Sequence, residues 1–480
     1  MAKLKNIIKQ LAEEDYKAIY DSLIESNADK SAYLLMAMRE KHLTDNKIMG
    51  ELEVNTNAYY TLRSRLNQKI EEYLLQQMEN PRTDILKKVA NINEILFTKK
   101  RAIAVATLKK LEKELIDYDL SNELTIVYKS LKKLNLNSVD HFNYSQLYNK
   151  HVAYMLAIDK AEDILAKYFK KFGEYSLSGD DTDKLELQLL NKEMFNVCSL
   201  YDSHRMYVYL SCLNIFHRLY IDKEEDMEDD QEPVEDVLNK VNKILSLYHL
   251  DSIYYHLQIV FEFLKLEYYN HYKVYRKAEN FFEEVNETVS NLLSNYSLYT
   301  YPAQFLITKI RRHIRTNTEQ EMYNENDGLF HDFENDPTDI PKYTTYVVYW
   351  AISCYYADKY DEAARWVNNL LNEVSLKKYP YALLEIKTLL ALQYCHLKDF
   401  DLFNQLINSI QRQIRILGKE QCTDVLNFTK ILKLSIGDNK KSKEEKMRAL
   451  INKLPKGSKH VFSPINLVKI DDNFVQKLCK

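Results

Sequence analysis

Glycine and proline are scarce in this sequence, with 7 and 8 residues among 480, against usual shares of about 7% and about 5%. Sandwiches, barrels and nucleotide-binding α/β folds use glycine at tight turns and at close backbone approaches. Helix interiors avoid glycine, because it costs up to about 1 kcal/mol relative to alanine. The composition therefore argues against most sheet folds and predicts an all-α chain.

Paired cysteines and long apolar runs are also missing. The 6 cysteines include no Cys-x-x-Cys pair, which favours reduced thiols that pack as small hydrophobic side chains. No stretch approaches the roughly 18 consecutive apolar residues of a membrane span, and the N-terminus lacks the apolar core of a signal peptide. We therefore expect a cytoplasmic protein without a membrane partner.

The sequence has no large excess of charge of one sign. Its 66 basic and 70 acidic residues leave a net charge of −4, so no overall field attracts nucleic acid or anionic lipid. Such a partner would have to bind a local basic patch. One patch is the segment KIRRHIR at 309–315, for which a solvated helix face, a contact with the acidic segment 222–236, a phosphate contact and a protein contact all stay open.

Motifs that carry catalysis are not found in the sequence. It contains no HExxH, no nucleophile elbow and no phosphate-binding glycine loop, and its 12 histidines are dispersed. His249 with His256, and Glu267 with His271, have helical spacing but no third ligand beside them. We therefore predict no catalytic residue, no metal site and no cofactor, and a protein that is not an enzyme.

Apolar residues recur at intervals of three and four along the chain, as in Leu108, Leu111 and Leu115. This period is typical of α-helices. We expect an all-α fold of antiparallel helix pairs stacked as an α-solenoid. The expected segments are an N-terminal helical cap at 1–80, divergent repeats at 81–221, repeats at 237–315 and 343–454, and an extended tail at 455–480 that packs across the last helices. The polar stretches 222–236 and 316–343 are expected to be linkers or loops.

An ordered set of small, aromatic and apolar residues recurs in the second half of the chain. The matching triplets are Tyr275, Ala278 and Phe282, then Tyr360, Ala363 and Val367, then Phe400, Phe403 and Ile407. Over residues 255–415 this order resembles the tetratricopeptide repeat, a helix-turn-helix unit that stacks into a superhelix. The chain departs from that family in the interval of 40 residues from Tyr360 to Phe400 and in lacking a regular closing proline.

The resemblance implies a concave surface lined by the first helix of each unit. That surface would be aromatic and mixed polar, and would suit an extended or helical peptide with apolar anchors. Tyrosines also fill helix contacts without any ligand, so the assignment ranks positions only. The positions assigned to this partner-binding groove are Phe263, Glu267, Asn270, His271, Ile352, Tyr355, Tyr356, Thr388 and His396, with Val348 and Leu392 beside them.

Residues 44–70 contain a second motif, two helical segments separated by a polar break near Val54 and Asn55. The motif resembles the DNA-reading helix-turn-helix unit of bacterial sigma factors. Glu53 stands where such units usually have glycine, and residues 1–78 carry 11 basic and 12 acidic residues. A helical pair that only caps the solenoid therefore stays an alternative. The residues that the resemblance assigns to DNA contacts are Asn57, Tyr60, Arg63, Ser64 and Arg65.

Two functions follow as expectations. The first is a non-enzymatic scaffold or adaptor that holds a protein or peptide segment in the concave groove. The second is a transcription regulator with an N-terminal DNA-binding helix-turn-helix and a repeat domain that senses a partner. Exposure of Asn57, Tyr60, Ser64 and Arg65 favours the second, and burial of these residues favours the first. The sequence does not predict the oligomeric state, nor whether segment 316–343 fills the groove.

Overall fold

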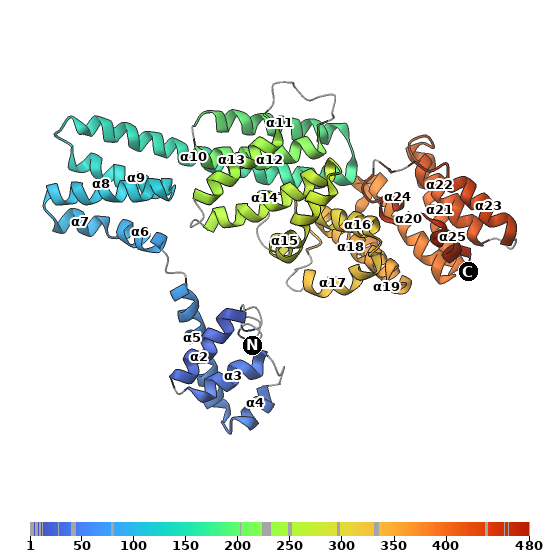
Figure 1. Ribbon diagram of the computed structural model, residues 1–480, viewed down its shortest axis with the longest axis horizontal. Helices are drawn as coiled ribbons and strands as arrows, with labels where there is room; N and C mark the ends of the chain where they lie inside the picture. Colours follow the sequence, from blue (N-terminus) through green and yellow to red (C-terminus); the bar gives the residue numbers. More distant parts are fainter. Residues whose placement is uncertain are drawn as a thin grey trace. The chain divides into compact units, whose positions relative to one another are not determined.

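The computed structural model describes residues 4, 8, 11, 13–26, 28–39, 45–77, 81–201, 203–222, 232–247, 252–294, 298–330, 336–436, 440–455, 457–458 and 460–479. These residues form 24 α-helices, α2 to α25, with short 3-10 helices between some of them and no strand (Figure 1). The predicted all-α fold is confirmed. None of the helices in this part of the chain is both long and apolar enough to cross a lipid bilayer.

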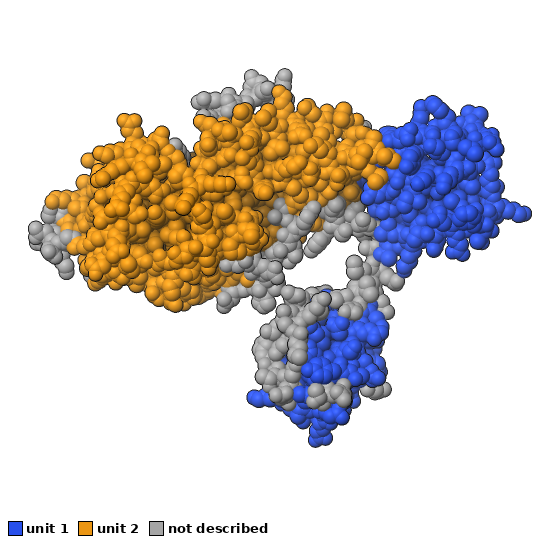
Figure 2. Space-filling view, turned by 180° about the vertical axis from the view of Figure 1, so that it is seen from behind, with its two compact units in different colours: residues 1–151 blue, residues 152–480 orange. Residues whose placement is uncertain are grey.

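The chain divides into two compact units, Met1–His151 and Val152–Lys480 (Figure 2). The division falls inside the long helix α10, Asp140–Ser178, and so within the segment 81–221 that the sequence analysis treated as one. Unit 1 has two separate hydrophobic clusters, one among residues 4–73 and one among residues 85–148.

The helices of unit 1 follow the two clusters. Leu108, Leu111 and Leu115 are buried in the second cluster, as their spacing predicts. The helices of the first cluster are α2 (Glu13–Glu25), α3 (Asp29–Arg39), α4 (Asp45–Glu51) and α5 (Thr56–Gln77). Those of the second are α6 (Pro81–Ala90), α7 (Ile92–Thr98), α8 (Arg101–Asp117), α9 (Ser121–Leu134) and the start of α10.

Unit 2 continues from α10 as helices that pack on their neighbours in sequence, in pairs such as α14 with α15, α18 with α19, and α20 with α21. This is the predicted α-solenoid of antiparallel pairs. Its helices are α11 (Asp181–Ser199), α12 (His204–Tyr220), α13 (Val234–Leu247), α14 (Ser252–His271), α15 (Tyr275–Ser294), α16 (Gln304–Thr316), η2 (Glu319–Glu321), α17 (Met322–Leu329), α18 (Ile340–Tyr356), α19 (Tyr360–Glu373), η3 (Leu376–Lys378), α20 (Pro380–Leu397), α21 (Phe400–Leu417), α22 (Thr423–Ile436), α23 (Lys440–Ile451), α24 (Pro464–Leu467) and α25 (Asp472–Cys479).

The turns between the paired helices repeat the same geometry. Lys273, Asp358 and Lys398 have positive φ angles of 58°, 58° and 57°, and each stands two residues before the aromatic residue that begins the second helix. The next backbone N–H donates to the carbonyl five residues earlier, from Val274 to Tyr269 and equivalently in the other two turns. This is the Schellman end of a helix, built here without glycine. The recurring turn supports the repeat register that the sequence indicated.

Two segments differ from expectation. Residues 319–329 of the polar stretch 316–343 form η2 and α17 rather than a loop, because Met322 and Leu329 are buried against the neighbouring helices. The tail contains the short helices α24 and α25 rather than an extended chain throughout. It does pack across the last helices, since α24 contacts α16 and α20, and α25 contacts α20, α22 and α23.

Candidate functional site

The groove positions predicted from the repeat lie on α14, α18 and α20. Asn270, Tyr356 and His396 are half-buried, and His271 is exposed. The other positions are buried, and they are Phe263, Glu267, Val348, Ile352, Tyr355, Thr388 and Leu392. In this structure these seven side chains therefore face the interior of unit 2 rather than an accessible surface.

Helix α12 and helix α16 supply partners for the groove positions of α14. The hydroxyl of Tyr220 donates a hydrogen bond to the carboxylate of Glu267, and burial raises the pKa of Glu267 to about 7. Arg315 Nη1 on α16 donates to Asn270 Oδ1 at 3.5 Å. At this end of the predicted groove, Glu267 and Asn270 therefore bind side chains of the chain itself.

The C-terminal segment occupies the face of α18 near Tyr356. The Tyr356 hydroxyl donates to the backbone oxygen of Leu467 at 3.2 Å and accepts from the backbone N–H of Lys469 at 2.9 Å. The Lys469 ammonium also lies 3.1 Å from a carboxylate oxygen of Glu319 in η2. The chain's own tail and part of segment 316–343 therefore meet at this predicted groove position.

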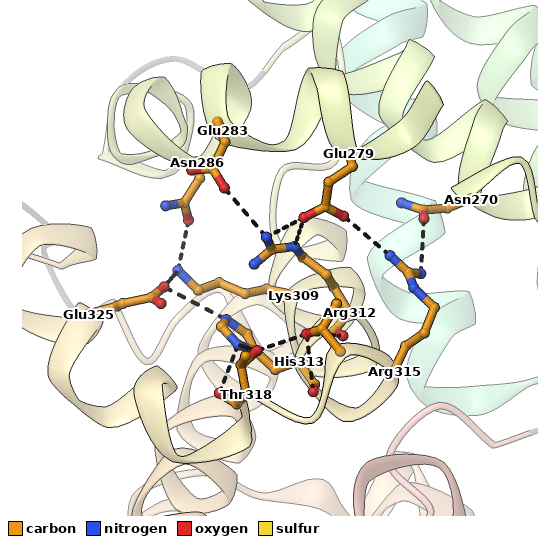
Figure 3. A network of polar contacts seen from close by, with 11 residues as sticks. Asn270, Glu279, Glu283, Asn286, Lys309, Arg312, His313, Arg315, Thr318 and Glu325 are labelled. Carbon is orange, nitrogen blue, oxygen red and sulfur yellow. Dashed lines mark hydrogen bonds and ion pairs between the residues drawn. The ribbon is translucent and has the colours of Figure 1, made fainter. Parts of the chain in front are cut away.

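The basic cluster at 309–315 is paired with carboxylates of the chain (Figure 3). Arg312 binds Glu279 and Glu283 on α15, Arg315 Nη2 lies 3.6 Å from Glu279, and Lys309 pairs with Glu325 on α17. Residues 223–231 of the acidic segment lie outside the described part of the chain. The acidic partners observed for this cluster lie on α15 and α17, and the sequence analysis named neither of these helices as its partner.

Helices α4 and α5 are joined by a short turn in the segment that the sequence analysis compared with a helix-turn-helix. Ile48, Leu52 and Tyr59 are buried in the first cluster of unit 1, with Met49, Val54 and Leu62 packed against it. Glu53 adopts the left-handed conformation with a φ angle of 51°, which that turn requires of the residue in the usual glycine position. Asn55 caps the N-terminus of α5, since its side-chain oxygen accepts from the Ala58 N–H at 2.8 Å.

Helix α3 holds the turn in place from the other side. The Lys30 ammonium donates to the backbone oxygen of Leu52 at 3.2 Å. A positive charge at this position stabilises the C-terminal end of α4, where the backbone carbonyls carry partial negative charge. The Tyr33 hydroxyl donates to the carboxylate of Glu51, and α5 packs on α3. The sequence analysis missed Lys30 and Tyr33, because contacts between separate helices leave no periodic signal.

The residues assigned to DNA contacts are placed differently from those of the groove. Tyr60, Ser64 and Arg65 are exposed on α5, and Arg63 is half-buried with its guanidinium 5.8 Å from the centre of the Tyr59 ring. Asn57 belongs to α5, but its side chain lies outside the described residues. The accessible face of α5 thus presents hydroxyl and guanidinium groups of the kind that contact bases and phosphates.

One group of residues in the described part of the chain combines ligand types that bind metals: His313, Glu321 and Glu325. The sequence analysis did not find this group, because it expected residues 316–343 to be a loop, whereas His313, Glu321 and Glu325 lie in the separate elements α16, η2 and α17. They come together only because the chain reverses after α16.

Comparison with protein-family models, with curated proteins and with solved structures finds no match to this chain. The resemblances to the tetratricopeptide repeat and to sigma-factor helix-turn-helix units therefore depend on the residues and on the geometry described above.

Proposed function

We propose that this protein is a DNA-binding regulator. In this proposal α4 and α5 act as a helix-turn-helix, with the N-terminal half of α5 in the major groove, and unit 2 acts as a tetratricopeptide-like domain that responds to a partner. The observation that carries the proposal is the exposure of Tyr60, Ser64 and Arg65 on a helix whose opposite face completes a core of its own. Exposure of these residues is what distinguishes a reading helix from a simple helical cap.

Charge sets the expected strength of binding. Residues 56–69 contain three basic residues, Arg63, Arg65 and Lys69, and no acidic residue. Each neutralised phosphate contributes a slope of about −0.9 to the dependence of the logarithm of affinity on the logarithm of salt concentration. Three such contacts give a slope of roughly −3. We therefore expect modest affinity for arbitrary DNA, with specificity added by the hydroxyl-bearing side chains.

The test is a binding titration of the full chain with a pool of random-sequence duplex DNA, repeated at several salt concentrations. A double variant, Arg63→Ala with Arg65→Ala, should lose most binding and reduce the slope to about −1, because only one of three phosphate contacts remains. The matched control is Lys99→Ala with Lys100→Ala, which removes the same charge from two exposed positions between α7 and α8.

Selection of bound duplexes from the same pool then separates specific from nonspecific contact. A recovered consensus that Ser64→Ala or Tyr60→Ala alters at one base position supports base reading by α5. Equal weakening by the arginine and the lysine double variants would show that charge alone holds DNA. In that case α4 and α5 would be a structural cap.

The second candidate function is a scaffold that holds a protein segment, and the observation favouring it is the binding of tail main chain by Tyr356. Of the predicted groove positions on α14, His271 is exposed and Asn270 is half-buried, so we test this function at these two residues. A protein that co-purifies after nuclease treatment, and is lost in an Asn270→Ala, His271→Ala variant of unchanged stability, would support this function. Unchanged co-purification in that variant would count against it.

A further inference from the structure

Three side chains that can ligate a metal converge where the chain reverses between α16 and α17. His313 lies in the last turn of α16, Glu321 in η2 and Glu325 in α17. One ligand atom from each lies within 4.8 Å of those of the other two. Asn317, with a φ angle of 59° at the end of α16, turns the chain back so that these elements face each other.

His313 is oriented as a metal-binding histidine usually is. Its Nδ1 lies 3.0 Å from the backbone oxygen of Thr318 and 2.9 Å from the hydroxyl oxygen of the same residue. A carbonyl oxygen only accepts, so Nδ1 carries the proton and Nε2 keeps its lone pair. Such a hydrogen bond to the second ring nitrogen fixes the tautomer and the ring direction in metal sites.

The Nε2 atom of His313 has no hydrogen-bond partner although the side chain is fully buried. A carboxylate oxygen of Glu325 lies 3.7 Å from this atom (Figure 3). A buried acceptor without a partner costs about 1–3 kcal/mol. A cation between Nε2 and the carboxylates would satisfy this atom.

The charges around the group allow one divalent cation. Lys309 pairs with Glu325 and donates to Asn286 Oδ1 at 2.7 Å, so it competes with a metal for the Glu325 carboxylate. Arg312 is turned away toward Glu279 and Glu283. Two carboxylates and one ammonium leave a net charge of −1 at the group, which a divalent ion would convert to +1.

We propose that His313 Nε2, Glu321 and Glu325 bind a divalent transition-metal ion that joins α16 to α17. One imidazole and two carboxylates form a donor set that suits Zn²⁺, with a further position left for water. Glu321 is exposed, which gives an ion a route to the buried imidazole. This inference is independent of DNA binding, since every ligand lies in unit 2.

Calorimetric titration of the full chain with Zn²⁺, and absorption spectroscopy with Co²⁺ as a coloured substitute, test the proposal. We expect saturation at one ion per chain and Co²⁺ bands without thiolate charge transfer. Glu321→Gln should weaken binding by at least about tenfold, as should His313→Gln. Lys309→Met should tighten it, because the competing ammonium is gone.

The matched control is Glu283→Gln, an exposed carboxylate of the same network that lies outside the proposed ligand set. It should bind the ion as the unaltered chain does. Because Glu321 is exposed, its variant decides the question even where His313→Gln fails to fold. Binding that is equal in Glu321→Gln and the unaltered chain, thiolate bands with Co²⁺, or no saturable binding would each overturn the proposal.

Discussion

The exposed face of α5 and the predicted groove of unit 2 were both inferred from outward positions on helices, yet most of the groove positions are buried, whereas Tyr60, Ser64 and Arg65 on α5 are exposed. Helix α5 packs on α2 and α3 and keeps a polar face. Helix α18 contacts α16, α17 and α19, and α20 contacts α19, α21, α22 and the tail. A helix that is apolar on all sides is a buried helix. The first helix of a repeat can line a groove only where other helices leave one of its faces uncovered, and α18 and α20 are packed against several helices each.

The largest expected effect comes from truncating a buried groove position. Phe263→Ala should lower the free energy of unfolding of unit 2 by about 3–5 kcal/mol, because it leaves a cavity between helices. Tyr60→Ala on α5 should change stability by less than about 0.5 kcal/mol while it weakens DNA binding. Urea denaturation of both variants, with the DNA titration beside it, measures the contrast.

Equal and small stability losses in the two variants would erase this contrast. Phe263 would then belong to an adaptable surface, and the groove would open readily to a partner. A large loss in Phe263→Ala with normal DNA binding would instead separate the core of unit 2 from the exposed face of α5.

The second effect depends on pH and concerns a buried acid on α20. Burial raises the pKa of Glu385 to about 8, while the neighbouring Ser463 hydroxyl of the tail acts in the opposite direction and the charge of Asp424 acts in the same direction. An acid whose pKa is higher in the folded state than in the unfolded state binds its proton more tightly when folded. Its contribution to stability is full below the unfolded value of 4.5 and is lost as the pH rises through about 8.

Glu385→Gln removes that loss, since glutamine stays neutral. We expect the variant to match the unaltered chain at pH 4.5 and to exceed its free energy of unfolding by several kcal/mol near pH 8, since each pKa unit corresponds to about 1.4 kcal/mol. Glu420→Gln, at an exposed position, should give the same pH dependence as the unaltered chain. A pH profile of Glu385→Gln parallel to that of the unaltered chain would contradict a buried neutral acid beneath the tail.

The positions of helices and of their crossings were predictable from the sequence, while contacts between residues far apart in the sequence were not. The triplet beginning at Tyr275 predicted where helices cross, and Ala278 and Ala363 are buried at those positions. Polar residues such as Glu321 and Asn324 suggested a loop where α17 forms, because Met322 and Leu329 outweigh them once α18 is beside them. The contact of Tyr356 with Lys469 joins residues 113 positions apart, and no pattern along the chain predicts such a pair.

The smallest effect concerns the turns, which the two regions share. The N–H of Val54 donates to the carbonyl of Met49, the same five-residue bond that closes the repeat turns, and Glu53 has the same left-handed conformation as Lys398. That conformation costs a non-glycine residue about 1–2 kcal/mol, and glycine loses about 0.4–1 kcal/mol more entropy on folding. Glu53→Gly and Lys398→Gly should therefore each stabilise the local helix pair by roughly 0.5–1 kcal/mol.

Native-state hydrogen exchange measures this locally, through slower exchange of the amides of α4 and α5 in one variant and of α20 and α21 in the other. Equal gains would show that both turns are held by backbone geometry alone. A loss in Glu53→Gly beside a gain in Lys398→Gly would mean that the Glu53 side chain itself supports the helix-turn-helix. The absence of glycine at position 53 would then reflect a contact that the Glu53 side chain makes. In the repeats, the absence of glycine would reflect only a conformational cost that the packed helices tolerate.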